Sequence, residues 1–163
     1  MIKNENLKIV LFDFDDTLCI HNRSIHYSDE EYYKLLIHSS EWWTKIGCEP
    51  SKHMKEFMLL MKSQGTRLGL ISQTDSYIHM IRKNEWVQTN YEIELENFCV
   101  ACNVSKVNMM IALSKAYNIR RNTILLVDDK ESILCEAVNN GFQAASPMEV
   151  VNYITDEKRL RID

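Results

Sequence analysis

Three carboxylates in four residues stand directly after an apolar run near the start of the chain. The run is Ile9 to Phe12, and the acids are Asp13, Asp15 and Asp16. Because the run does not alternate apolar and polar residues, it predicts a strand that is buried on both faces. Asp13 and Asp15 are two positions apart, so both can reach one point in space. Carboxylates repel there unless a hard cation lies between them, and oxygen ligands of this kind favour magnesium.

Side chains that can do chemistry also follow later apolar runs. They are Ser72, Lys106, Asp128 and Asp129. In a parallel sheet the carboxyl ends of the strands meet at one edge, which is where ligands bind. We therefore expect these four side chains to lie close to Asp13. A hydroxyl, an ammonium and several carboxylates are the groups that a phosphate and magnesium site requires.

The elements that position these residues alternate along the chain. Apolar runs predict five strands, at 9–12, 68–71, 98–101, 123–127 and 142–145, with Cys19 to Tyr27 as a polar loop. Amphipathic stretches predict helices at 28–47, 50–65, 75–84, from 105, up to 141 and from 146, and two of them begin with the capping boxes Ser28–Glu31 and Ser146–Glu149. The pattern predicts an α/β fold, a Rossmann-like parallel sheet of about five strands with helices on both faces.

The connection between the first two predicted strands holds two helices where one would suffice. We therefore expect a single domain, 1–163, with residues 19–49 as a small lid inserted at the carboxyl edge of the sheet and 156–163 as a charged tail. The lid and its loop offer aromatic and basic side chains that could contact a substrate: Tyr32, Tyr33, Trp42, Trp43, His21, Arg23 and His26. Alternatively, the tryptophans only pack this helix down and the loop is solvated.

Composition limits the remaining possibilities. The 163 residues are 45% apolar and 26% charged, as in soluble globular proteins. No apolar stretch approaches the ~18 residues of a membrane span, and the first residues lack a signal-peptide core, so we expect a cytoplasmic protein without a membrane partner. The net charge of -4 argues against nucleic acid as a partner. The sequence leaves the oligomeric state open.

The cysteines are expected to be free thiols. Their number, five, is odd, and they are scattered through a chain without an export signal. Cys99 and Cys102 form a CxxC pair beside an apolar run. One such pair cannot complete a four-ligand zinc site, so packing in the core is favoured over metal or redox work.

Residues 13–18, DFDDTL, resemble the first motif, DxDxT, of the haloacid dehalogenase-like (HAD) phosphohydrolases. Ser72 resembles the second motif of that superfamily, Lys106 the third, and the stretch VDDKE at 127–131 the fourth. The motifs occur in the family order over about residues 8–147. The chain is most similar to the small magnesium-dependent phosphatase branch.

This resemblance implies a HAD-like fold and a magnesium-dependent phosphatase that acts on small phosphorylated substrates. Asp13 would attack the phosphorus and form an aspartyl-phosphate, Asp15 would act as acid and base, and Lys106 would stabilise negative charge. Mg2+ would be held by Asp13, Asp15 (through its backbone carbonyl) and Asp129, with Asp128 behind them holding Lys106. The phosphate group would be bound by Phe14, Thr17, Ser72, Gln73 and Lys106.

The sequence departs from the family pattern at two positions. Asp16 stands where many members have a small residue, and Ile133 stands four residues after Asp129, where an acid or amide is usual. The second departure predicts weak metal binding. Two alternative functions stay open: transfer to a carrier protein, as in glyceryl-loading HAD-like enzymes, which 97–119 resembles, and a HAD-like module that binds phosphate and partners without turnover.

Overall fold

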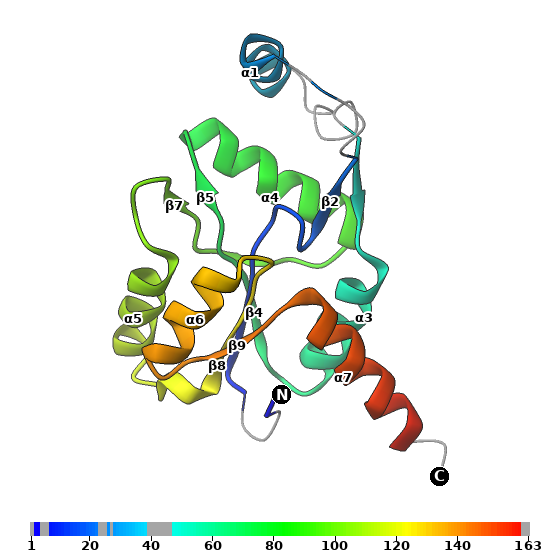
Figure 1. Ribbon diagram of the computed structural model, residues 1–163, viewed down its shortest axis with the longest axis vertical. Helices are drawn as coiled ribbons and strands as arrows, with labels where there is room; N and C mark the ends of the chain where they lie inside the picture. The colour runs from blue at the N-terminus through cyan, green and yellow to red at the C-terminus, as the bar shows by residue number, and fades with distance from the viewer. Residues whose placement is uncertain (1, 4–6, 23–25, 27, 39–46, 161–163) are drawn as a thin grey trace.

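The computed structural model describes residues 2–3, 7–22, 26, 28–38 and 47–160 (Figure 1). Its centre is a parallel five-stranded sheet in the order β6-β4-β1-β8-β9. The strands are β1 (Ile9–Phe12), β4 (Arg67–Leu70), β6 (Glu96–Asn97), β8 (Ile124–Val127) and β9 (Gln143–Ala145). Every residue of β1 is buried, and Ile9 pairs with Arg67 on one side and with Ile124 on the other. The predicted α/β class and parallel sheet are therefore confirmed.

Helices cover both faces of this sheet. Val10 and Phe12 of β1 point into a core that also holds side chains of α3 (Lys52–Ser63), α4 (Tyr77–Tyr91) and α7 (Pro147–Leu160). Ile9 and Leu11 point the other way, into a core with α5 (Lys106–Ala116) and α6 (Glu131–Asn139). A short 3-10 helix, Arg121–Thr123, leads into β8. Successive side chains of β1 therefore alternate between the two cores, as expected for a strand that is buried on both faces.

A hairpin stands where the sequence suggested a polar loop. β2 (Cys19–His21) pairs antiparallel with β3 (Cys48–Pro50), so that His21 lies opposite Cys48. Pro50 therefore ends a strand instead of opening a helix, and Ser51 caps α3 through its side chain. The predicted loop over 19–21 is wrong, because these residues find a partner strand that lies far away in the sequence.

The predicted lid helix is described only in its first part. α1 (Asp29–His38) begins at the predicted capping box, in which the Ser28 amide donates to the Glu31 carboxylate and the Glu31 amide donates to the Ser28 hydroxyl. The helix contacts α4, where the rings of Tyr32 and His79 lie 6.4 Å apart (Figure 1). Arg23 and the stretch with Trp42 and Trp43 lie outside the described residues, so the proposed substrate contacts of the lid stay predictions.

Three other boundaries differ from the sequence-based expectations. In place of one strand at 98–101, β6 joins the main sheet and β7 (Val100–Ala101) pairs with β5 (Gln73–Thr74) in a small ribbon. Phe98 packs over Gly69, where an added Cβ would approach its ring to 2.7 Å. α4 continues to Tyr91, well past the predicted end at 84, and α7 continues to Leu160, so most of the expected tail is helical.

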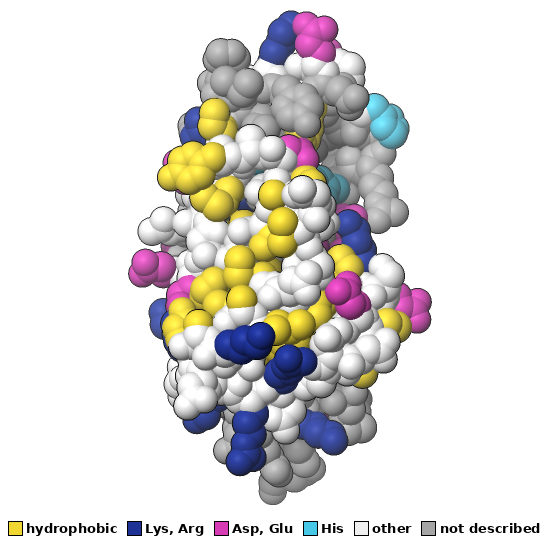
Figure 2. Space-filling model, turned by 90° about the vertical axis from the view of Figure 1, so that its left-hand side faces the viewer, with side chains coloured by type: hydrophobic (Ala, Val, Ile, Leu, Met, Phe, Trp, Pro, Cys, Tyr) yellow, Lys and Arg dark blue, Asp and Glu magenta, His cyan; other side chains and the backbone are white. Residues whose placement is uncertain are grey.

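Some apolar side chains stay on the surface. On the face shown in Figure 2, hydrophobic side chains form a band across the middle, and Lys and Arg side chains gather below it. Tyr77, Val104 and Tyr117 are among the exposed large apolar residues. Exposed apolar side chains are common on the surfaces of folded chains. Among the described residues, no helix has both the length and the apolar character needed to cross a bilayer.

Candidate active site

Asp13 continues β1 beyond its last residue and is held in the middle of the sheet edge. Its amide donates to the carbonyl of Val127 at 2.9 Å, and only 3% of the residue is exposed. The next residues form a tight turn, in which the Phe14 carbonyl accepts from the amides of Leu18 and Cys19. Asp16 adopts a φ of 51°, a left-handed conformation that Asp tolerates better than most residues. Asp at this position, instead of a small residue, is therefore compatible with the turn.

Lys106 is a buried cation between two carboxylates. Its Nζ lies 2.7 Å from Asp13 Oδ1 and donates to Asp128 Oδ2, also at 2.7 Å. The contact to Asp13 has the distance of an ion pair but not the angles of a hydrogen bond. Lys106 is the first residue of α5, whose amino end is capped by the hydroxyl of Ser105. The expected contact of Asp128 with Lys106 is thus present.

Three carboxylates form a cluster that can hold a cation. Oxygen atoms of Asp13, Asp128 and Asp129 all lie within 4.8 Å of one another. Burial raises the pKa of Asp13 to about 6, with the charge of Asp128 adding to the shift and Lys106 opposing it. Burial and the neighbouring Asp128 also raise the pKa of Asp129. Carboxylates that repel one another in this way fit a hard divalent ion such as Mg2+, which would relieve the repulsion.

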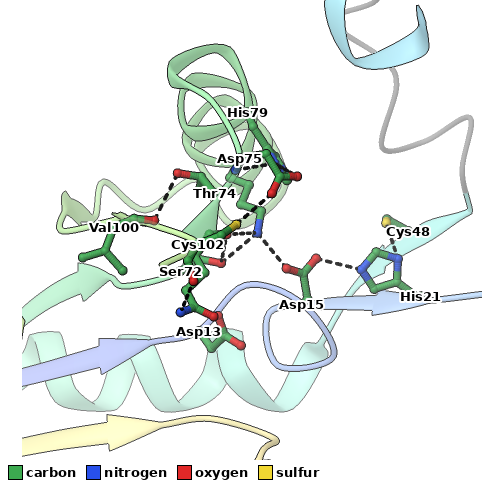
Figure 3. Close-up of polar contacts among 12 residues, drawn as sticks. Asp13, Asp15, His21, Cys48, Ser72, Thr74, Asp75, His79, Val100 and Cys102 are labelled. Carbon is green, nitrogen blue, oxygen red and sulfur yellow. Dashed lines mark hydrogen bonds and ion pairs between the residues drawn. The ribbon is translucent and has the colours of Figure 1, made fainter. Parts of the chain in front are cut away.

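Asp15 is not part of this cluster and instead contacts α4 and the β2–β3 hairpin (Figure 3). Its Oδ2 accepts from Lys83 Nζ at 2.7 Å, and its Oδ1 lies 3.0 Å from His21 Nε2. Burial would raise the pKa of Asp15, but the hydrogen bonds from His21 and Lys83 outweigh it and hold that pKa well below the usual range. Each oxygen of the Asp15 carboxylate therefore faces a nitrogen that can donate a proton, one from Lys83 and one from His21.

Lys83 is a site residue that the sequence analysis missed. Only 1% of it is exposed, and besides Asp15 it donates to the hydroxyl of Ser72 at 2.8 Å and to the carbonyl of Gln73 at 3.1 Å. The signal was present in the sequence, because Lys83 shares the buried stripe of α4 with His79, Trp86 and Val87. A lysine in an apolar stripe needs a buried partner. Because the predicted helix ended at 84, Trp86 and Val87 fell outside it, and the apolar stripe around Lys83 was not recognised.

His21 connects Asp15 to a pair of cysteines. Its Nδ1 lies 3.4 Å from Cys48 Sγ, and Cys19 is buried beside them. The hydrogen bond with Asp15, helped by Cys48, raises the pKa of His21 to about 10. The pKa of Cys48 is lowered to about 6, first by its hydrogen bond with Cys19 and then by His21. The sequence pattern predicts His21 only as a possible substrate contact, and its hydrogen bond with Asp15 is found in the structure alone.

The other predicted phosphate contacts are placed as follows. Ser72 is buried at the end of β4, and Thr17 is buried with no hydrogen-bond partner for its hydroxyl in the described part of the chain. The ring of Phe14 lies in the core, edge-on to Trp86 at 5.3 Å. The Gln73 side chain donates to two backbone carbonyls, those of Cys102 and Val104. The roles of these residues toward a phosphate stay predictions.

The CxxC pair does not pack as expected. Cys102 is exposed, and its thiol donates to Asp75 at 2.7 Å, so core packing is wrong for this residue. The cause is the turn between β7 and α5, which carries Cys102 out of the apolar layer. Cys99 is half-buried and contacts the core. Among the described residues, neither cysteine belongs to a group of three metal-binding side chains.

No protein-family model matches the chain, and no curated protein matches it in sequence. Its fold is nevertheless similar to that of many solved structures. The amino-terminal part of BF1531 from Bacteroides fragilis, which contains a phosphatase domain complexed with Mg, has a TM-score of 0.60 at 15% identity, over 92% of this chain and 40% of that one. The HAD-family enzyme bt-2542 from Bacteroides thetaiotaomicron, in complex with magnesium and inorganic phosphate, has a TM-score of 0.56 at 14% identity, over 86% and 93%.

A third similar structure comes from Haemophilus influenzae. It is the cobalt-bound deoxy-D-mannose-octulosonate 8-phosphate phosphatase YrbI, with a TM-score of 0.52 at 13% identity, over 88% of this chain and 70% of that one. At such identities the comparison establishes the fold. The sequence pattern predicted the parallel sheet and the acidic end of its first strand. The chain therefore has the fold of the haloacid dehalogenase-like (HAD) superfamily.

Proposed function

We propose that the protein is a magnesium-dependent phosphatase that hydrolyses phosphomonoesters through an aspartyl-phosphate on Asp13. One observation carries this proposal: a single buried carboxylate, Asp13, is shared between a buried ammonium, Lys106, and two further carboxylates. A nucleophile, a positive charge for the phosphoryl oxygens and oxygen ligands for a cation are thus together at one strand end. The fold it shares with solved phosphatases supports the proposal.

In the first half-reaction, an oxygen of Asp13 bonds to phosphorus while the bond from phosphorus to the leaving oxygen breaks. Asp15 gives that oxygen a proton, so an alcohol leaves. Because the pKa of Asp15 is held well below its usual range, Asp15 is ionised at rest and passes on a proton from Lys83, which donates to its carboxylate. In the second half-reaction, water attacks the phosphorus, Asp15 takes the water's proton and returns it to Lys83, and the bond between Asp13 and phosphorus breaks to release phosphate.

Two other residues would stabilise the phosphoryl group. Lys106 would place its charge where negative charge develops. Ser72 accepts from Lys83, and its own O–H makes only a long contact, 3.5 Å, to the Gln73 carbonyl, so this proton is left to donate to a phosphoryl oxygen. Asp13 and Asp129 would hold Mg2+, with the Asp15 carbonyl completing the protein ligands. When bound, the ion supplies charge neutralisation between the nucleophile and its anionic substrate.

The test is hydrolysis of p-nitrophenyl phosphate with Mg2+ and after chelation. Wild type should turn over only with the metal, and Asp13→Asn should show no detectable turnover. Asp16→Asn is the matched control, because it changes a neighbouring acid that has no role in the chemistry and should keep most of the activity. Equal activity of the Asp13→Asn and wild-type proteins would refute the proposal.

A second assay separates hydrolysis from transfer. If the chain loads an acyl or phosphoryl group onto a carrier protein, the group should appear on the carrier and little free phosphate should form. We expect free phosphate in stoichiometric amounts with the alcohol. Binding of phosphate without any turnover, in wild type with Mg2+, would point instead to a regulatory module.

A further inference from the structure

A second cluster of metal-binding side chains lies beside Asp15, in the β2–β3 hairpin. Cys19, His21 and Cys48 each offer one ligand atom, and these atoms all lie within 4.8 Å of one another. The hairpin produces this arrangement, since Cys19 and His21 alternate onto one face of β2 and Cys48 pairs with His21 from β3. Two sulfurs and an imidazole nitrogen are soft or intermediate ligands, which suit zinc and not magnesium.

The one ligand-to-ligand distance given by the structure matches a tetrahedral centre. With metal–sulfur and metal–nitrogen bonds of about 2.3 Å and 2.0–2.1 Å, a tetrahedral ion separates a sulfur and a nitrogen ligand by roughly 3.5 Å. In the structure, Cys48 Sγ and His21 Nδ1 are 3.4 Å apart. The two side chains can therefore bind one ion with little change of position.

The histidine is also oriented as a metal ligand. Asp15 holds the ring at Nε2, and because an ionised carboxylate can only accept, Nε2 carries a proton there. The other nitrogen, Nδ1, is directed at Cys48 (Figure 3). A carboxylate that holds the far nitrogen of a histidine is the usual support of a zinc ligand. Burial alone would fit core packing of Cys19 and Cys48, but it does not account for this orientation.

We propose that Cys19, Cys48 and His21 Nδ1 form a zinc site that is separate from the carboxylate cluster. Binding requires both sulfurs as thiolates and Nδ1 without a proton, so every proton that these three atoms carry is released to the solvent when Zn2+ is taken up. The metal takes Nδ1 and so fixes the proton of His21 on Nε2, where it donates to Asp15. The site thereby links the hairpin at the base of the lid segment to the side chain of Asp15.

Cobalt titration of the full-length protein, reduced and stripped with a chelator, tests the site. Co2+ should give the charge-transfer absorption of cobalt bound to thiolate, saturating at one equivalent, and Zn2+ should abolish it. Carboxylates cannot give this band, so binding at Asp13, Asp128 and Asp129 does not interfere. Asp13→Asn should keep the band, which separates this proposal from the proposed phosphatase function.

Variants and controls follow from the geometry. Cys19→Ser and Cys48→Ser should each lose most of the band, whereas Cys135→Ser, at an exposed thiol of α6, should keep it. Asp15→Asn should keep the band but bind about 10–100-fold more weakly, as expected for loss of a histidine's supporting carboxylate. If the serine variants fail to fold, X-ray absorption of zinc-loaded wild type decides: two sulfurs in the zinc shell support the site. A shell of nitrogen and oxygen alone, or a band that survives in Cys48→Ser, would overturn it.

Discussion

Lys83 Nζ lies 2.7 Å from Asp15 Oδ2, and the same ammonium donates to the hydroxyl of Ser72. One buried cation of α4 thus joins the turn after β1 to the end of β4. Burying a lysine is costly unless its hydrogen bonds are satisfied, and Lys83 makes three. Lys83 thus positions the Asp15 carboxylate for proton transfer. Because the Ser72 oxygen accepts from Lys83, the hydroxyl proton of Ser72 points away from Lys83.

The first prediction is that Lys83→Met lowers kcat on p-nitrophenyl phosphate by about tenfold or more, since Asp15 and Ser72 both lose their donor. Met conserves the volume of the side chain, so the fold should survive. Lys115→Met, at an exposed position of α5, is the control and should leave kcat unchanged. A Lys83→Met enzyme with wild-type kcat and a normal melting temperature would contradict the role.

The second prediction concerns pH and stability, measured in the presence of a chelator. The folded state raises the pKa of His21 from 6.5 to about 10, so the stability that His21 contributes is complete below pH 6.5 and is lost as pH rises through 10. The pKa of Asp15 is lowered, so the stability that Asp15 contributes is complete above pH 3.8, its ordinary pKa, and is lost as the pH falls below that value. The free energy of unfolding lost in His21→Gln should therefore be largest between about pH 4 and 6.5.

The expected size is about 1 kcal/mol, because the Asp15 side chain is 46% exposed and its pairs are partly screened. Urea unfolding at several pH values gives the measurement. In an Asp15→Asn background the same substitution should cost less and depend less on pH. A loss that stays constant from pH 5 to pH 10 would show that the pair does not titrate in this way.

The third prediction is weak magnesium binding. Ile133 packs against the core beneath α6, so an apolar residue stands where the family usually has an oxygen ligand near the metal. We expect activity to rise into the millimolar range of Mg2+, and Ile133→Asp to lower the concentration that is needed. Val138→Asp, which adds the same charge at an exposed site on α6, controls for charge. Micromolar affinity in wild type by isothermal titration would contradict this.

The fourth prediction concerns selectivity and falls on residues outside the described ranges. If the lid segment contacts the part of the substrate that does not react, Arg23→Ala and Trp42→Ala should change the ranking of phosphate esters more than they change turnover of p-nitrophenyl phosphate. A panel of sugar phosphates, nucleotides and phosphopeptides would measure this. Equal losses on every substrate would favour a purely structural role for both residues.

The sequence predicted the parts of the site that depend on local pattern. An unbroken apolar run followed by acids identified β1 and Asp13, and the runs before Ser72 and Asp128 identified β4 and β8 to within a residue or two. Their meeting at one edge followed from the rule for parallel sheets. These predictions held because a strand buried on both faces leaves a strong signal in composition.

Features that depend on distant partners were not predicted. β6 is Glu96–Asn97, two polar residues without an apolar pattern, and it is a strand because β4 lies beside it. The β2–β3 hairpin joins residues on either side of a long insertion, so no short window contains it. Lys83 reaches Asp15 across 68 residues of sequence. Such contacts follow from packing, which spacing along the chain does not reveal.

If Asp13 carries the phosphoryl group during turnover, the covalent intermediate can be trapped on this residue. Wild type would be mixed with p-nitrophenyl phosphate and Mg2+, quenched in acid within the first turnover, digested and analysed by mass spectrometry. We expect phosphate on the peptide that contains Asp13, localised to that residue, and none in Asp13→Asn. Phosphate on another residue, or full turnover by Asp13→Asn, would contradict it.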